Sequence, residues 1–193
     1  MGRKLINAFK VELDKIKSDE LRDITKKILS TCPDYICECS TSSSNKYHPE
    51  WSNGKGGLIR HTKAVCAVLE RMLTQRPQYD TEQWDIPYIA AILHDMCKYT
   101  EDKQEHSHND HPIRMGEKIR EYQPKEPNEL FGILERIIDC ITTHMSRWNK
   151  DKQGKVIGWV PENEEQHLVA TADMIVAGKF IHINFDENNN LTN

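Results

Sequence analysis

Apolar residues recur every three or four positions along most of the chain, which is the period of an amphipathic α-helix. Residues 3–30 predict one or two helices, on stripes formed by Leu5, Phe9, Leu13 and Ile16 and then by Leu21, Ile24 and Ile28. Five further segments repeat the period, at about 58–73, 82–99, 112–122, 128–146 and 164–179. Alternating strand patterns are nearly absent, so the pattern predicts an all-α bundle of about six to eight helices.

Polar segments separate the predicted helices. The stretches STSSSN at 40–45 and WSNGKGG at 51–57 have turn chemistry and predict a long loop. The segment 149–159 predicts a loop or a short hairpin, and the polar end DENNNLTN predicts disorder. We therefore expect three regions: N-terminal helices and a polar loop over 1–55 that pack on the core, the core itself over 56–180, and a disordered tail over 181–193.

Composition sets limits on the binding partners. The length of 193 residues suits one domain, and a hydrophobic fraction of 37% with a mean hydropathy of −0.71 predicts a lean core. Charged residues of both signs make up 29% of the chain, and the net charge of −4 argues against extended nucleic-acid binding. A small anionic substrate in a locally positive pocket is compatible with this balance. The oligomeric state stays open, a homo-oligomer included.

The sequence also bears on the compartment. No apolar run approaches the length of about 20 residues that crosses a bilayer, and the N-terminus lacks a secretory signal, so no membrane partner is expected. The six cysteines form no CxxC pair, and Cys66, Cys97 and Cys140 lie within apolar helical patterns. We therefore expect reduced thiols in a cytoplasmic protein.

Six histidine and aspartate residues continue the apolar stripes of five predicted helices. They are His61, His94, Asp95, His111, His144 and Asp173. A lone inward histidine is most often a hydrogen-bonded core residue, but six converging residues are poorly explained in that way. Burying an unpaired imidazole or carboxylate costs several kcal/mol unless it is paired or bound to a metal. The pattern therefore predicts a site for one or two divalent metal ions.

The donor types narrow the metal and the chemistry. Four imidazoles and two carboxylates without a thiolate suit Mn, Fe, Zn, Co or Mg and argue against a structural zinc site of the cysteine type. Asp95 directly follows His94, and an inward aspartate at this place can bridge two ions. Two ions about 3.5–4 Å apart activate water and hold both oxygens of a phosphoryl displacement. Phosphoester hydrolysis is the reaction that this arrangement favours.

At these residues the chain resembles the HD-domain phosphohydrolase superfamily. The resemblance spans residues 56–175, through the motifs GGLIRHT at 56–62, ILHDMCKY at 92–99, HPIRMGEKI at 111–119, ITTHMSRW at 141–148 and VATADMI at 169–175. It implies an HD-domain-like helical bundle in which 56–180 is the metal-dependent catalytic core. It also implies two ligand sets that share Asp95, namely His61, His94, Asp95 and Asp173 for a first metal and Asp95, His111 and His144 for a second.

The resemblance implies a phosphodiesterase or nucleotidase that cleaves a phosphoester bond of a nucleotide or small oligonucleotide by metal-activated hydroxide. Met145 and Ser146 stand where the HD-GYP branch has histidine and glutamate, which argues against cyclic-di-GMP hydrolysis. Two alternatives stay open. One is a di-iron oxygenase of the same domain type, because histidine and aspartate suit iron equally well. The other is a catalytically silent sensor that binds a nucleotide.

Several further residues are candidates for the site. Lys98, in HDxxK, matches the lysine that the family places near substrate phosphate, and we expect it to act in catalysis with Asp95. Arg147 and Trp148 follow His144 and can contact phosphate and stack on a base, although an ordinary exposed arginine and a packing tryptophan explain them equally well.

Two competing assignments involve other histidines. His106 and His108 are rivals of His111, which we prefer because HPxxxG matches the family and its helical face runs inward. A second rival is a zinc knuckle of irregular spacing, made of Cys32, Cys37, Cys39 and His48.

Overall fold

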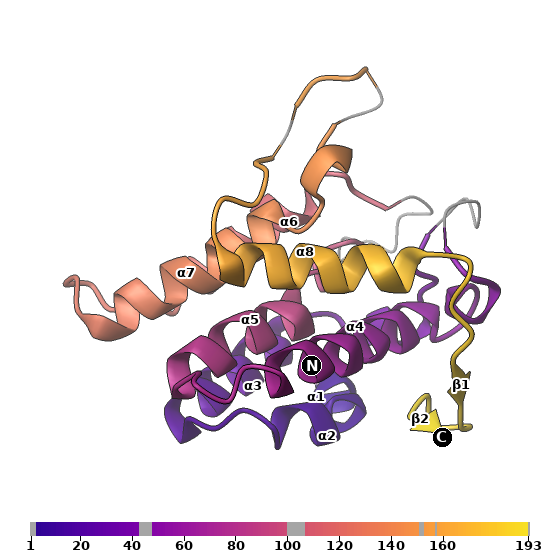
Figure 1. The fold of residues 1–193 in the computed structure, drawn as a ribbon, viewed down its shortest axis with the longest axis horizontal. Coiled ribbons are helices and arrows are strands. Elements are labelled where there is room, and N and C mark those ends of the chain that lie inside the picture. Colours follow the sequence, from indigo (N-terminus) through magenta and orange to yellow (C-terminus); the bar gives the residue numbers. More distant parts are fainter. Residues whose placement is uncertain (1–2, 43–47, 100–106, 151–152, 157, 193) are drawn as a thin grey trace.

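The computed structural model describes residues 3–42, 48–99, 107–150, 153–156 and 158–192 (Figure 1). Within these residues the chain forms eight α-helices: α1 (Arg3–Ala8), α2 (Lys10–Leu13), α3 (Asp19–Thr31), α4 (Gly57–Thr74), α5 (Thr81–Leu93), α6 (His111–Arg120), α7 (Glu129–Thr143) and α8 (Glu164–Ala177). The other described elements are the 3₁₀ turns η1 (Asp34–Glu38), η2 (Glu50–Ser52) and η3 (Ser146–Trp148) and the strands β1 (Asn184–Phe185) and β2 (Leu191–Thr192). The prediction of an all-α fold is confirmed. No helix within the described ranges is long and apolar enough to cross a membrane.

Four helices begin at a polar residue whose side chain accepts a backbone N–H of the first turn. Ser18 has this role for α3, Asn128 for α7 and Asn163 for α8. Asp80 begins α5 with a capping box: its carboxylate accepts the Gln83 N–H at 2.8 Å, and the Gln83 side chain accepts the Asp80 N–H at 3.1 Å. These N–H groups have no partner inside the helix, so the caps set where each helix begins.

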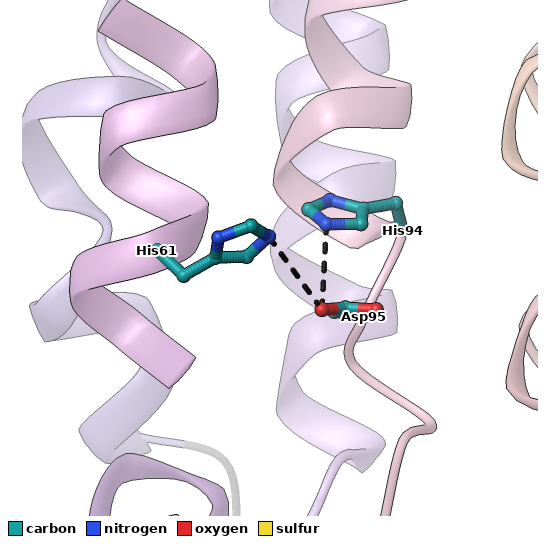
Figure 2. A group of neighbouring side chains, drawn as sticks. All are labelled: His61, His94 and Asp95. Atoms are coloured by element: carbon teal, nitrogen blue, oxygen red, sulfur yellow. Dashed lines mark ion pairs between the residues drawn. The ribbon is translucent and has the colours of Figure 1, made fainter. Parts of the chain in front are cut away.

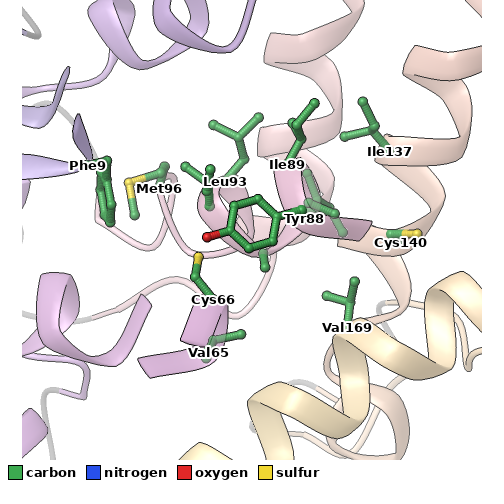
Figure 3. Packing of buried hydrophobic residues seen from close by; sticks show 14 of the residues in the cluster. Phe9, Val65, Cys66, Tyr88, Ile89, Leu93, Met96, Ile137, Cys140 and Val169 are labelled. Atoms are coloured by element: carbon green, nitrogen blue, oxygen red, sulfur yellow. The ribbon is translucent and has the colours of Figure 1, made fainter. Parts of the chain in front are cut away.

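The hydrophobic core joins helices from all parts of the chain. Helix α4 packs on α5 and α8, while α7 packs on α5, α6 and α8. Figure 3 shows the centre of this core, where the fully buried ring of Tyr88 from α5 lies among Cys66 of α4, Ile137 of α7 and Val169 of α8. Close packing of this kind fixes the helices relative to one another, so that side chains near their ends are held in place.

The N-terminal helices belong to the same core. Leu5, Phe9, Leu13 and Ile16 form the buried stripe that the period predicted, and each is at most 1% exposed. The backbone leaves the helical conformation at Phe9, with φ of −100° and ψ of 19°, so α1 and α2 are separate helices. Residues 3–30 therefore contain three helices where the stripes predicted one or two.

Helices α5 and α7 end three or more residues sooner than the apolar period predicts, and a histidine directly follows each of them. Helix α5 stops at residue 93 rather than 99, and α7 stops at residue 143 rather than 146. Nδ1 of His94 lies 2.8 Å from the carbonyl oxygen of Ala91, and Nδ1 of His144 lies 2.7 Å from that of Ile141. Each ring thus binds the carbonyl that the next helical N–H would use, and this competition favours termination at that point.

The C-terminal tail forms a hairpin, where the sequence of 181–193 predicted disorder. Strand β1 pairs with β2, and two asparagines of the turn bind to α4. Asn189 Oδ1 accepts a hydrogen bond of 2.6 Å from Arg60, and Asn190 Oδ1 accepts one of 2.5 Å from Lys63. The asparagines that made the tail look disordered are therefore the groups that attach it to the bundle.

The described residues between α7 and α8 form the base of a short hairpin, which was one of the two sequence alternatives for 149–159. Lys150 and Val156 form an isolated antiparallel bridge. The Asn149 side-chain amide donates a hydrogen bond of 2.9 Å to the carbonyl oxygen of Gly158. Together these two contacts close the base of the segment.

Candidate metal centre

The six histidine and aspartate residues that the sequence singled out lie together in one cluster. His61 lies on α4, His111 begins α6, and Asp173 lies on α8, while residues 94–95 follow α5 and His144 follows α7. Five of the six side chains are at most 4% exposed, and that of Asp173 is 21% exposed. Figure 2 shows two of the histidines approaching Asp95 from α4 and from the end of α5. The cluster therefore depends on the packing of five different helices.

Asp95 lies at the centre of the cluster, and its two carboxylate oxygens face different histidines. Oδ2 lies 3.8 Å from Nε2 of His61 and 3.5 Å from Nε2 of His94. Oδ1 lies 2.9 Å from Nε2 of His111 and 3.9 Å from Nε2 of His144. One carboxylate thus joins two groups of ligand-type atoms, and the atoms of each group lie within 4.8 Å of one another.

Asp173 approaches the first group from α8. Its Oδ1 lies 2.9 Å from Nε2 of His61 and 3.9 Å from Nε2 of His94. In the second group, the Nε2 atoms of His111 and His144 lie 3.4 Å apart. The arrangement is therefore two compact sets of donors on either side of the shared aspartate, with the additional carboxylate on the first set only.

Backbone carbonyls orient three of the four imidazoles. Nδ1 of His94 and of His144 contacts the carbonyl three residues earlier, and Nδ1 of His111 lies 2.6 Å from the carbonyl oxygen of His108. A ring that donates through Nδ1 keeps a lone pair on Nε2, the nitrogen that faces the cluster here. His108, which the sequence offered as a rival ligand, thus orients the His111 ring through its backbone oxygen. His106, the other rival, lies outside the described residues.

The polar atoms of the cluster fit a metal ion. Both ring nitrogens of His61 and Nε2 of His94 are buried without a well-aligned hydrogen bond. Such unsatisfied atoms cost about 1–3 kcal/mol each. A divalent cation would satisfy the Nε2 atoms of His61 and His94 and neutralise the carboxylates together, and a donor set without thiolate suits Mn, Fe, Co, Mg or Zn.

Burial and charge act in opposite directions on the pKa values of the cluster. Burial alone would raise the pKa of Asp95, but the Lys98 ammonium and His94 outweigh it and lower that pKa well below its usual value. Burial lowers the pKa of His144 to about 3, and the neighbouring His94 adds to this effect. Burial would also lower the pKa of His94, but Asp95 and Asp173 outweigh it and raise that pKa. At neutral pH, Asp95 is thus ionised and His144 neutral, the states in which these side chains bind metals.

One of the three expected substrate-binding residues lies at the cluster. The Nζ atom of Lys98 is 2.8 Å from Oδ2 of Asp95, and the Lys98 side chain is 13% exposed. Arg147 and Trp148 lie on η3 at the surface, outside the buried cluster. Only the lysine therefore shares an immediate environment with the ligand-type side chains.

His48 is a further histidine at the cluster, although the sequence indicated it only as a member of the rival zinc knuckle. Its ring centroid lies 5.3 Å from that of His61, with 81° between the rings, and its Nδ1 is buried without a hydrogen-bond partner. Burial, together with His61, lowers its pKa to about 4. Because His48 lies in a polar loop, outside any helical stripe, the helical period could not place it at the cluster. Among the described residues it forms no metal-holding group with the cysteines of the rival zinc knuckle, Cys32, Cys37 and Cys39.

Comparison with known proteins adds a family match over the same part of the chain. A family model described as HD domain matches residues 58–178, which is more than half of the chain and includes all six residues of the cluster. No curated protein matches the chain, and no solved structure matches it.

Proposed function

This chain belongs to the HD domain family, and on that premise we propose that it is a metal-dependent phosphohydrolase. We propose further that it cleaves a phosphoester bond of a nucleotide or small oligonucleotide, as a phosphodiesterase or a nucleotidase. Family membership and the buried cluster of histidines and aspartates support the hydrolase. The choice of a nucleotide as substrate rests on the family-level expectation and is tested by a panel of nucleotides.

The observation that carries the proposal is the position of Asp95. Its Oδ1 and Oδ2 atoms each face two imidazole nitrogens, so this single carboxylate belongs to both donor groups. A carboxylate in that position is available to two ions at once, and two such ions would act together on one phosphoryl group. We therefore propose that two divalent ions bind here and share Asp95, with Mn as the first ion to test.

The side chains of the site have two roles: the histidines would bind the metal ions, and Lys98 supplies a positive charge. Divalent ions, when bound, would activate water and polarise a phosphoryl group. His94, His111 and His144 are held by backbone carbonyls, so their Nε2 atoms are already oriented toward the ligand positions. Lys98 places an ammonium at the same carboxylate, where it would bind the negative charge of a phosphoryl oxygen.

The test is hydrolysis of simple esters by protein purified with added Mn²⁺. We expect turnover of bis(p-nitrophenyl) phosphate or of p-nitrophenyl phosphate, and the preferred ester distinguishes a phosphodiesterase from a nucleotidase. A panel of nucleotides with product identification then defines the bond and the base. Asp95→Ala should reduce the rate to background. Lys98→Gln should lower kcat/KM by about 10- to 100-fold, as expected when a charge-assisted hydrogen bond is removed, and should leave the bound metal unchanged.

The matched control is His167→Ala, which removes an exposed histidine from the same helix as Asp173. This variant should hydrolyse the esters at the wild-type rate. Equal rates in the wild type and the Asp95→Ala variant would contradict the proposal. Oxygen uptake by iron-loaded protein, without release of nitrophenol, would instead support the di-iron oxygenase.

A further inference from the structure

Two large aromatic side chains are exposed on the segment that joins α7 and α8. We call residues 145–150, 153–156 and 158–160 the tryptophan arm; these described residues project from the bundle in Figure 1. Trp148 is 70% exposed and Trp159 is 60% exposed, whereas Trp51 and Trp84 pack against the core. Two of the four tryptophans of a chain with a lean core are thus left in water. Exposed aromatic rings that gather in one place mark a binding surface.

The arm brings its two tryptophans to the same place. Trp148 immediately precedes Asn149, and Trp159 immediately follows Gly158. Asn149 and Gly158 are joined by the hydrogen bond of 2.9 Å that closes the base of the arm, and Asn149 is buried. Both tryptophans therefore lie at the base of the hairpin, one on each strand, and not at its tip.

The base of the arm adjoins the metal centre. A Cβ on Gly158 would lie 3.2 Å from the carbonyl oxygen of Thr142, so the returning chain rests directly on the last turn of α7. His144, two residues further on, belongs to the second donor group. Ser146 then adopts a left-handed φ of 46°, which turns the chain out of the helix at once. Trp148 is four residues beyond His144 in the sequence, a span of at most about 14 Å even when extended.

The charge of the arm is opposite to that of the chain. The described residues of the arm contain three basic side chains and no acidic one, a net charge of +3, while the whole chain carries −4. Arg147 and Lys150 are both exposed, next to Trp148 in the sequence. A surface that combines aromatic rings with positive charge matches single-stranded nucleic acid, because bases stack on the rings while phosphates pair with the cations.

We propose that the tryptophan arm binds the single strand of a short oligonucleotide next to the phosphate that the metal centre would hydrolyse. This rests on the proposed function and deepens it, since it selects an oligonucleotide end over a mononucleotide. A second copy of the chain is the rival occupant of the exposed rings. In a two-fold dimer that forms arm to arm, however, the +3 of one arm would lie against the +3 of its copy, and this repulsion opposes association.

The experiment measures binding apart from turnover. Fluorescein-labelled oligothymidylates, from the dinucleotide to the octanucleotide, are titrated by anisotropy with protein kept in chelator, and unlabelled dTMP is the competitor. We expect the longer strands to bind more tightly than dTMP. Trp148→Ala and Trp159→Ala should each weaken binding by about 5- to 100-fold, the change that corresponds to one stacked base. Trp148→Phe should recover part of the affinity, because a smaller ring still stacks.

Two controls separate stacking from other effects. Phe180→Ala removes an aromatic side chain that is 78% exposed but lies outside the arm, and it should leave oligonucleotide binding unchanged. Joint replacement of Arg147 and Lys150 by alanine should weaken binding and flatten its salt dependence, by about 0.7 in log–log slope for each phosphate that the variant no longer binds. Equal affinity for dTMP and the octanucleotide, or undiminished binding by the tryptophan variants, would overturn the proposal. Self-association that disappears with Trp148→Ala would assign the arm to a second copy instead.

Hydrolysis of the aryl phosphodiester separates this proposal from the one on which it rests. The small ester carries no oligonucleotide strand, so its turnover by the wild type and by Phe180→Ala tests the metal centre separately from strand binding by the arm. Turnover without arm-dependent oligonucleotide binding keeps the hydrolase and discards the arm. Arm-dependent binding without turnover of any ester keeps the binding surface and discards the hydrolase.

Discussion

Replacing Asp95 by alanine should abolish binding of both metal ions, whereas replacing a histidine of one donor group should abolish binding of one. The reason is that the two oxygens of Asp95 face different histidines. Nε2 of His144 lies 3.9 Å from Oδ1 of Asp95, on the side of His111, while His61 and His94 face Oδ2. His144→Ala therefore removes a donor from the second group only, and Asp95→Ala removes the donor that both groups share.

The expected size of the effect follows from mass action. At an ion concentration of about 100 times the Kd, each bound ion stabilises the folded state by about 2.7 kcal/mol. For a chain of this length, about 1 kcal/mol raises the Tm by about 2–4 °C, so each ion should raise it by about 5–11 °C. Mn²⁺ should thus raise the Tm of the wild type by about 11–22 °C, that of His144→Ala by about half as much, and that of Asp95→Ala very little.

The measurement compares thermal unfolding in chelator with unfolding in Mn²⁺, and elemental analysis gives the number of ions for each protein. Each variant is referred to its own metal-free Tm, which removes any intrinsic change in stability. His167→Ala, which replaces an exposed histidine on α8, should behave as the wild type in both measurements. A wild type that holds a single ion would refute the shared-aspartate reasoning. So would an Asp95→Ala variant that gains as much from Mn²⁺ as His144→Ala does.

Three further predictions concern the scaffold. The Tyr88 hydroxyl is buried without a hydrogen-bond partner, so Tyr88→Phe should raise stability by about 1 kcal/mol, and a lower Tm would contradict this account. Asn190→Ala removes the acceptor of the buried Lys63 ammonium and should cost about 1.5–3 kcal/mol in urea unfolding; an unchanged midpoint would mean that the tail does not stabilise α4. Burial raises the pKa of Glu12 above its ordinary value of 4.5, so ionising this side chain opposes folding and the associated stability falls as pH rises from 4.5. Glu12→Gln should therefore be more stable than the wild type at pH 7 and lose this advantage near pH 4, as measured by urea unfolding at the two pH values.

The periodicity of the sequence was sufficient to predict the class of fold and the residues that gather at the candidate site. A side chain on the inward stripe of an amphipathic helix must face the other helices, so polar residues that continue such stripes converge once the helices pack. His61 continues the stripe of α4, and Asp173 that of α8, and the structure brings both to the same cluster. The helical period alone places these residues on inward faces, whatever the order in which the helices pack.

Features that depend on a specific hydrogen bond could not be predicted from the sequence. The period of apolar residues continues past residues 93 and 143, yet both helices end there, because a histidine ring binds the carbonyl of the last turn. His48 reaches the cluster from a polar loop, where no period exists to indicate its direction. The asparagines of the tail bind two long cationic side chains of α4, although these residues are distant in the sequence. Composition describes the polarity of such residues but not their partners.

The bonds that end the two helices also account for the location of the candidate site. Inside a helix the backbone N–H groups and carbonyls bind one another, so no carbonyl is left for a histidine ring. The direction of such a ring is therefore set by packing alone. At the end of a helix the last carbonyls are without helical partners, and the ring can bind one of them through Nδ1. His94 and His144 both do so. This contact leaves the lone pair of Nε2 available to a metal ion and removes most of the rotational freedom of the ring. Asp95 follows directly on the first of these histidines, beyond the last residue of α5, where its carboxylate reaches atoms on both sides. The interaction that terminates the helix thus orients the ligand, and for this reason the two groups of donors meet where α5 and α7 end.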